Sequence, residues 1–294
     1  MSVRLWFKTS PQQVDWATLD ATWAAAGELA VLDGGWMNDH LTDMAPDRSG
    51  PSLEALTAMA VLAHHVPGKW LGHGVLSNTF RHPAVLAKSA TVLDLASGGR
   101  FIVGLGAGWH EGEHRAFGLD LPPIGERIDR LESAVGVLRA LFSPEAASPP
   151  GVTRPDPFYP LSEATNEPGP ARPGGPPIYL GGQKRRGIAL AARSADGWIL
   201  PGDRADDVPY LVDRRDALLR ALEAEGRDPA AFAFVGQIAT GTERDAHRRS
   251  VEAGLAMAGA GATELVLALR PSLGPEGLRT LAREVAIPLR EGLG

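Results

Sequence analysis

Short apolar and β-branched runs alternate along this chain with longer segments whose apolar residues recur at helical spacing. Runs of the first kind are typical of buried parallel strands, and the longer segments are typical of helices that cover a sheet. Eight such pairs follow one another, which predicts the α/β class and a (β/α)₈ (TIM) barrel. The predicted strands cover residues 3–8, 31–37, 70–77, 101–106, 177–181, 196–200, 232–240 and 264–269.

The segments that follow these strands predict eight helices. The last of them places Leu278, Leu281 and Val285 at helical spacing, so we expect it to pack on the barrel and close the ring. A length of 294 residues is usual for one barrel domain, and a single domain is therefore predicted for residues 1–294. The predicted helices cover residues 14–27, 53–65, 83–96, 125–141, 186–194, 207–225, 244–258 and 275–291.

Prolines and glycines concentrate in residues 144–177, between the fourth helix and the fifth strand. Because proline removes a backbone donor and breaks regular elements, we expect this segment to be an insertion without helix or strand. A mobile surface loop and a lid over the site are both open interpretations. The connectivity places the insertion on the amino-terminal side of the barrel unless part of it crosses over, and Phe158 and Tyr159 could anchor it.

Composition narrows the class of partner. The chain has 29 Lys and Arg residues against 35 Asp and Glu residues, with a net charge of -6 and no long basic run, so we expect neither a nucleic-acid nor a membrane partner. The absence of cysteine excludes disulfides, thiolate catalysis and Cys-ligated metal centres. No apolar run is long enough to cross a bilayer, and the first residues do not resemble a signal peptide. We expect a cytoplasmic protein that acts on a small organic molecule.

Residues that follow the strands are the site candidates, because active sites of (β/α)₈ barrels lie at the carboxyl ends of the strands. Asp39 and His40 follow the second predicted strand. An imidazole beside a carboxylate suits proton or hydride chemistry near neutral pH, since the unperturbed pKa of histidine is about 6.5. We predict that His40 and Asp39 are catalytic. The alternative is a loop histidine beside an aspartate that caps the next segment.

Polar turns and glycines follow the next three strands and are candidate cofactor ligands. Glycines without side chains let the backbone approach a flat ligand, and a glycine turn before a basic helix start suits a phosphate. Caps and a solvated basic helix start are the structural alternatives, and Arg81 and Arg270 are further phosphate candidates. The predicted cofactor-binding residues are Asp39, Ser77, Asn78, Thr79, Gly106, Gly108, Trp109, Gly181, Gly182 and Gln183.

The string from His110 to His114 matches the H-E-x-x-H pattern of zinc peptidases. That pattern needs a stable helix to align both imidazoles, and Gly112 lies in its middle. No third ligand follows from the sequence. We therefore predict no metal site.

Several blocks in a fixed order resemble one known family, the luciferase-like monooxygenases and the deazaflavin-dependent reductases grouped with them. The resemblance covers nearly the whole chain and is strongest between Gly74 and Leu141. Its blocks are Ser77 to Pro83, Leu95 to Phe101, Gly104 to Trp109, Arg115 to Gly118, Gly125 to Arg127, Pro177 to Gly182 and Ala191 to Trp198.

The resemblance implies a barrel with a flavin or deazaflavin ring across the strand ends. It implies a non-proline cis peptide after the third strand, which maps onto Ser77-Asn78. Asp39 and His40 fall where the family places a ring-side acid and a catalytic histidine. Gly106 and Gly108 would give the ring clearance, and Gly181 and Gly182 would face the cofactor phosphate.

Two positions depart from the family pattern. Gly187 stands where relatives often carry a threonine for the phosphate, and Trp109 stands where the sugar-phosphate dehydrogenase branch carries a glutamate acid. The second departure argues against a sugar-phosphate substrate.

Asp39, His40 and the Ser77 to Pro83 stretch resemble the deazaflavin branch of the family. This resemblance implies hydride transfer between coenzyme F420 and an organic substrate. The alternatives are an FMN-dependent monooxygenase and a non-catalytic flavin-binding barrel. A homodimer is expected.

Overall fold

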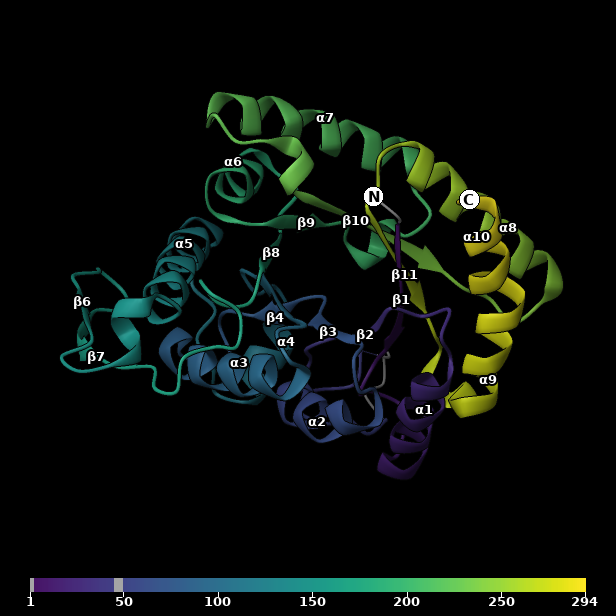
Figure 1. Ribbon diagram of the computed structural model, residues 1–294, viewed down its shortest axis with the longest axis horizontal. Coiled ribbons are helices and arrows are strands. Elements are labelled where there is room, and N and C mark those ends of the chain that lie inside the picture. Colours follow the sequence, from purple (N-terminus) through teal and green to yellow (C-terminus); the bar gives the residue numbers. More distant parts are fainter. Residues whose placement is uncertain (1–2, 45–49) are drawn as a thin grey trace.

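Residues 3–44 and 50–294 of the computed structural model form a closed parallel β-barrel surrounded by helices (Figure 1). The strands lie in the order β3-β2-β1-β11-β10-β9-β8-β5-β4, and an additional β3–β5 pairing closes the ring. The predicted (β/α)₈ barrel is confirmed. Its strands are β1 (Arg4–Thr9), β2 (Gly34–Met37), β3 (Trp70–His73), β4 (Leu76–Ser77), β5 (Phe101–Gly106), β8 (Ile178–Gly181), β9 (Gly197–Ile199), β10 (Ala233–Ala239) and β11 (Glu264–Ala268).

The outer ring of helices follows the predicted segments to within two or three residues. Its members are α1 (Trp16–Glu28), α2 (Ala55–Leu62), α3 (Pro83–Ser97), α5 (Ile124–Leu141), α6 (Arg185–Ser194), α7 (Val208–Ala224) and α8 (Arg244–Gly259). A short helix, α4 (Glu111–Ala116), follows β5. The last predicted helix is α9 (Gly274–Leu281) and α10 (Ile287–Gly292), joined by a π-helical stretch over Ala282–Ala286. Pro288 lacks a backbone donor, which fits this break in the helical ladder.

Side chains along the strands alternate between two apolar cores. Leu5 and Phe7 of β1 pack outward against the helices, and the Phe7 and Trp23 rings lie 5.0 Å apart. Trp6, between them, points into the barrel, where its ring lies 5.2 Å from that of Trp36. The barrel interior is therefore a packed core rather than a pore. The inner cluster comprises Trp6, Trp36, Ile102, Tyr179, Ile199, Val235 and Val266.

The third predicted strand differs from its prediction. Residues 70–77 form two strands, β3 and β4, separated by a cis peptide between Gly74 and Val75. The non-proline cis peptide exists, but its predicted place at Ser77-Asn78 was wrong. A Cβ atom on Gly74 would lie 2.8 Å from the Trp36 ring, so the chain passes directly over this inner side chain. The strand thus breaks where it contacts Trp36 of β2, and a contact between strands cannot be read from the local sequence.

The insertion over residues 144–177 also differs from its prediction. It contains a 3₁₀ turn (Pro144–Ala147) and an antiparallel pair, β6 (Val152–Arg154) and β7 (Leu161–Ala164), so the expectation of no regular element was wrong. Figure 1 shows this hairpin on the outside of the molecule beside α5.

Named side chains anchor the insertion to the helices. Tyr159 is buried, and its ring lies 5.2 Å from that of His82 at the start of α3. The Asn166 amide donates to the Leu141 carbonyl (2.9 Å) and to Thr91 Oγ1 (2.8 Å). Asp156 accepts the backbone N–H groups of Phe158 and Tyr159. Side-chain acceptors thus satisfy backbone donors that lack strand partners in this proline-rich segment.

Candidate functional site

The predicted site residues meet at one end of the barrel because all strands of the ring are parallel. Asp39 follows β2, Asn78 follows β4, Gly108 follows β5, and Gly182 follows β8. Several are in direct contact. The Ser77 N–H donates to Asp39 Oδ2 at 2.8 Å, and the Asn78 N–H donates to the Gly106 carbonyl at 2.9 Å.

His40 is held by a buried glutamate that sequence reasoning did not select. Its Nδ1 atom lies 3.1 Å from Oε2 of Glu113, a side chain that is 1% exposed. Burial raises the pKa of Glu113. Hydrogen bonds from His40 and from the Leu41 and Thr42 N–H groups lower it by more, so the net shift of the pKa is downward. An ionised acceptor places the proton of His40 on Nδ1. Nε2 then remains for a ligand, since it makes no hydrogen bond within residues 3–44 and 50–294.

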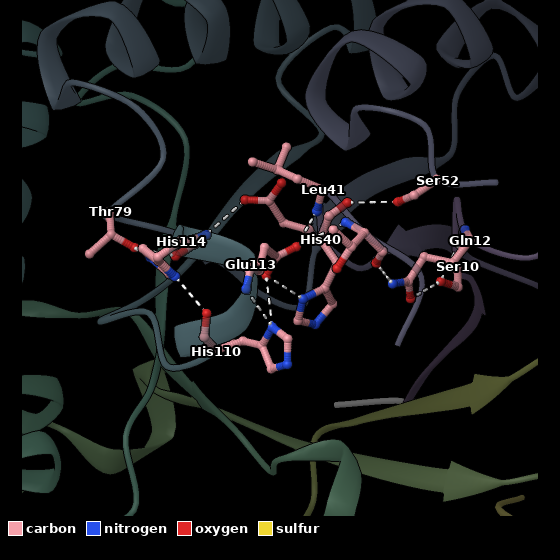
Figure 2. Close-up of polar contacts among 12 residues, drawn as sticks. Ser10, Gln12, His40, Leu41, Ser52, Thr79, His110, Glu113 and His114 are labelled. Atoms are coloured by element: carbon pink, nitrogen blue, oxygen red, sulfur yellow. Dashed lines mark hydrogen bonds and ion pairs between the residues drawn. The ribbon is translucent and has the colours of Figure 1, made fainter. Parts of the chain in front are cut away.

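The loop that carries His40 is also fixed through its backbone (Figure 2). The Ser52 hydroxyl donates to the His40 carbonyl at 3.0 Å, and the Gln12 amide donates to the Thr42 carbonyl. Ser10 in turn contacts the Gln12 side chain at 2.8 Å. The imidazole therefore lies on a loop that is tied to the segment after β1, to the chain before α2 and to α4.

Asp39 does not hydrogen-bond to His40, its sequence neighbour. Its buried carboxylate takes both guanidinium nitrogens of Arg81, at 2.7 and 2.9 Å, together with the Ser77 N–H. Arg81 also pairs with Glu54, whose pKa is lowered to about 2 because hydrogen bonds from Thr57 and Arg81 outweigh the effect of burial. Arg81 is therefore engaged by two carboxylates, and it is neither a helix cap nor free for a phosphate.

The H-E-x-x-H string forms a helix, so the expectation that Gly112 would prevent one was wrong. His110 is the N-cap of α4, and its Nδ1 accepts the Glu113 N–H at 3.1 Å. His114 turns elsewhere, with Nε2 at 2.7 Å from Thr79 Oγ1 and Nδ1 at 2.8 Å from the His110 carbonyl. The cap and these tertiary bonds stabilise a helix that propensity alone disfavours. Across residues 3–44 and 50–294, no group of three metal-ligating side chains forms.

Glycines line the rim of the barrel around Val75. A Cβ atom on Gly106 would lie 2.8 Å from Val75 Cγ2, and one on Gly181 would lie 3.5 Å from the same side chain. Gly108 has a φ of 79°, and a Cβ there would lie 2.4 Å from Thr79 Oγ1. Only glycine combines this backbone with this close approach. Trp109 follows, 63% exposed, with its ring 6.0 Å from that of His40.

The turn after β8 packs backbone against backbone. A Cβ atom on Gly182 would lie 3.0 Å from Gly187 Cα, and one on Gly187 would lie 2.9 Å from Gly182 Cα. A side chain at position 187, such as threonine, would therefore require the Gly182 backbone to shift. The carbonyl of Gly182 accepts Trp198 Nε1 at 2.7 Å, and the Gln183 side chain accepts the Tyr210 hydroxyl at 2.7 Å.

The fold and the site together define a (β/α)₈ barrel with a histidine–glutamate pair and a glycine rim at the strand ends. Residues 9–274 match the family described as luciferase-like monooxygenase, and the chain belongs to that family.

Similar proteins include enzymes named for coenzyme F420. The chain is 33% identical over 227 residues to an F420-dependent glucose-6-phosphate dehydrogenase of Kineococcus radiotolerans, which covers 76% of this chain and 64% of that protein. It is 30% identical over 254 residues to a phthiodiolone/phenolphthiodiolone dimycocerosates ketoreductase of Mycobacterium tuberculosis, which covers 78% of this chain and 62% of that protein. The chain thus spans somewhat less than two thirds of the length of these relatives.

Solved structures share the fold at low identity. An F420-dependent secondary alcohol dehydrogenase in complex with an F420-acetone adduct superposes with a TM-score of 0.80 and 17% identity, covering 98% of this chain and 99% of that one. A coenzyme F420-dependent tetrahydromethanopterin reductase of Methanopyrus kandleri gives a TM-score of 0.77 and 15% identity over the same shares.

No helix in the described part of the chain is both long and apolar enough to cross a membrane.

Proposed function

We propose that this protein is an oxidoreductase that transfers a hydride between coenzyme F420 and an organic substrate at the carboxyl end of the barrel. The observation that carries the proposal is the His40–Glu113 pair beside the glycine rim of Gly106 and Gly181. The F420-dependent activities named for the relatives support the choice of cofactor.

The residues at the rim fit a flat tricyclic ring. The Val75 side chain packs closely over Gly106 and is only partly buried, so its remaining surface gives a ring an apolar face to lie on. Asn78 is buried, and its Oδ1 atom has no hydrogen-bond partner among the described residues, so a ligand N–H would satisfy it. The proposed holding residues are Asp39, Ser77, Asn78, Thr79, Gly106, Gly108, Trp109, Gly181, Gly182 and Gln183.

A bound deazaflavin supplies two-electron hydride chemistry and activates oxygen poorly. His40 supplies the proton. Its Nε2 atom takes the proton of the substrate hydroxyl when an alcohol is oxidised, and returns it to the oxygen when a carbonyl is reduced. Glu113 keeps the second proton on Nδ1 and stabilises the imidazolium that forms, because its carboxylate is ionised and buried. Trp109 lies where the sugar-phosphate branch carries an acid, so we do not propose glucose 6-phosphate as the substrate.

Equilibrium binding tests the cofactor directly. Purified protein is titrated with F420 and, separately, with FMN, and quenching of tryptophan fluorescence is followed. We expect micromolar or tighter binding of F420 and weaker binding of FMN, followed by F420-dependent turnover with a panel of secondary alcohols and ketones. Preferred binding of FMN with oxygen consumption would favour monooxygenation instead. Binding without turnover of any substrate would leave the non-catalytic barrel.

Exposed apolar side chains on α2 and α3 support a homodimer as part of the proposal. Val85, Val92 and Leu95 of α3 and Val61 of α2 are between 43% and 61% exposed. Contiguous exposed apolar residues commonly mark interaction surfaces. Light scattering on a size-exclusion column should give the mass of two chains, and Val92→Glu should shift the protein toward one.

A further inference from the structure

Lys8 lies inside the mouth of the barrel. Leu5 and Phe7 of β1 belong to the outer core and Trp6 belongs to the inner one, so the two-residue alternation points Lys8 inward, directly above Trp6. Its Nζ atom hydrogen-bonds to Oε1 of Gln237. Gln237 lies on β10 above Val235, another member of the inner cluster.

Few bulky side chains stand two residues beyond the inner cluster along the strands. This step leads to Gly104 on β5, Gly181 on β8 and Ala268 on β11, and to Asn38 and Pro201 just after β2 and β9. The loop after β9 adds Gly202, where a Cβ atom would lie 3.8 Å from both Lys8 Nζ and Gln237 Oε1. Lys8 is thus the charged group at this step, with Gln237 and Asn38 as its neutral polar members and small residues on β5, β8 and β11.

The charge of Lys8 is not balanced by a carboxylate. Among residues 3–44 and 50–294, Lys8 forms no ion pair, and its partner Gln237 is a neutral amide whose nitrogen is engaged by the Leu200 carbonyl. Arg4 and Glu264 begin β1 and β11 at the opposite end of the barrel, and these two charged side chains pair with each other.

Two further features bear on the charge of Lys8, namely a carboxylate on the neighbouring loop and the burial of the ammonium group. Asp206, on the loop after β9, accepts the Ala239 N–H. Burial lowers the pKa of Lys8 to about 8, so most molecules still carry the charge at neutral pH. A partly buried cation without a counterion attracts an anion.

We infer that Lys8, oriented by Gln237, is the group that binds a carboxylate of the organic substrate. One ammonium balances one negative charge, which suits a carboxylate better than a phosphate dianion. In the strand order, β1 and β10 are separated by intervening strands from β5 and β8, whose glycines form the proposed cofactor rim, so Lys8 faces that rim from another wall. The inference rests on the proposed function for the identity of the reaction, but not for the binding of the anion.

Anion binding is measured without cofactor. The chain has only four lysines, Lys8, Lys69, Lys88 and Lys184, so NMR of protein labelled with ¹³C at the lysine ε-carbon resolves each one. Lys8→Met assigns the signal of Lys8. We expect sodium acetate to shift that signal saturably and to raise the pKa of Lys8, because a bound carboxylate favours the charged form. An unresponsive Lys8 signal would overturn the inference.

Two further variants make the NMR test specific. Gln237→Glu should abolish the acetate response by placing a carboxylate beside Lys8, and the Lys8 signal should then titrate at higher pH. Lys88→Met is the matched control, since Lys88 is an exposed residue of α3 that contacts the Glu167 carbonyl. It should leave the acetate response unchanged. A Lys8 signal that still shifts saturably with acetate in Gln237→Glu would place the anion elsewhere and overturn the inference.

Kinetics separates substrate from cofactor. For Lys8→Met, we expect KM to rise about ten to a hundredfold for a keto acid and to change less than threefold for its neutral methyl ester, as expected for loss of a charged hydrogen bond. The Kd for F420 should be unchanged. A weaker Kd for F420, with equal effects on both substrates, would make Lys8 a cofactor ligand and overturn the inference. Failure to bind F420 would instead sink the proposed function and leave the acetate result standing.

Discussion

His40 Nδ1 lies 3.1 Å from Glu113 Oε2, although the two residues are 73 positions apart in the chain. The carboxylate also accepts two backbone N–H groups of the His40 loop, so it orients the imidazole and fixes the loop at once. This arrangement assigns different tasks to the two residues, which mutation can separate.

Glu113→Gln should lower turnover by about ten to a hundredfold while leaving the Kd for F420 within a few-fold. The amide keeps the shape of the glutamate but has no charge to stabilise an imidazolium. Its N–H group can also donate to Nδ1, which would move the proton of neutral His40 to Nε2. His40→Ala should cost more, on the order of 10² to 10⁴ in turnover, because the acid–base group itself is lost. Steady-state kinetics normalised to bound cofactor measures both. If both variants lower Tm equally and leave the turnover per folded molecule unchanged, the pair has only a structural role.

Arg81→Met should destabilise the fold by roughly 3–5 kcal/mol and lower Tm by roughly 6–10 °C, because it leaves the buried Asp39 carboxylate without its bidentate partner. Thermal unfolding measures the loss. The control is Arg248→Met, which removes an exposed pair with Glu252 and should shift Tm little. Similar small shifts for both variants would mean that the Asp39–Arg81 pair adds no more than a surface pair.

Gly182→Val should abolish F420 binding, since its side chain enters the contact with Gly187 Cα and the turn proposed to face the phosphate. Lys184→Ala should weaken binding modestly and in a salt-dependent way, because it removes only a solvent-screened charge. Fluorescence titrations at low and high salt compare the two, and circular dichroism checks that Gly182→Val is folded. Small and equal effects would argue against a phosphate at this turn.

Acid should weaken the fold through His73. Burial lowers the pKa of His73 to about 4, against about 6.5 in the unfolded chain, so the unfolded state binds a proton that the folded state excludes between these values. Stability from this group is full above pH 6.5 and is lost as the pH falls toward 4. His73→Leu should therefore remove about 2 kcal/mol of the decline between pH 7 and pH 5. Urea unfolding at both pH values measures it, and parallel declines in the two proteins would contradict it.

The sequence by itself predicted the barrel and the end at which the candidate site lies. Strand and helix periods are local properties, and each element buries the face that its own pattern marks, as Leu278, Leu281 and Val285 do at the closing helix. Because parallel strands end together, residues such as Asp39, Asn78 and Gly182 could be assigned to one rim without knowing their contacts.

Only the tertiary structure decided which side chains face one another across that rim. Asp39 lies beside His40 in sequence but pairs with Arg81, and Glu113 from a misleading metal motif holds the imidazole instead. The cis peptide lies at Gly74-Val75, where the chain crosses Trp36, and Lys8 meets Gln237 across the barrel. These contacts join residues far apart in the chain, and their partners are selected by barrel closure and burial, which no local pattern records.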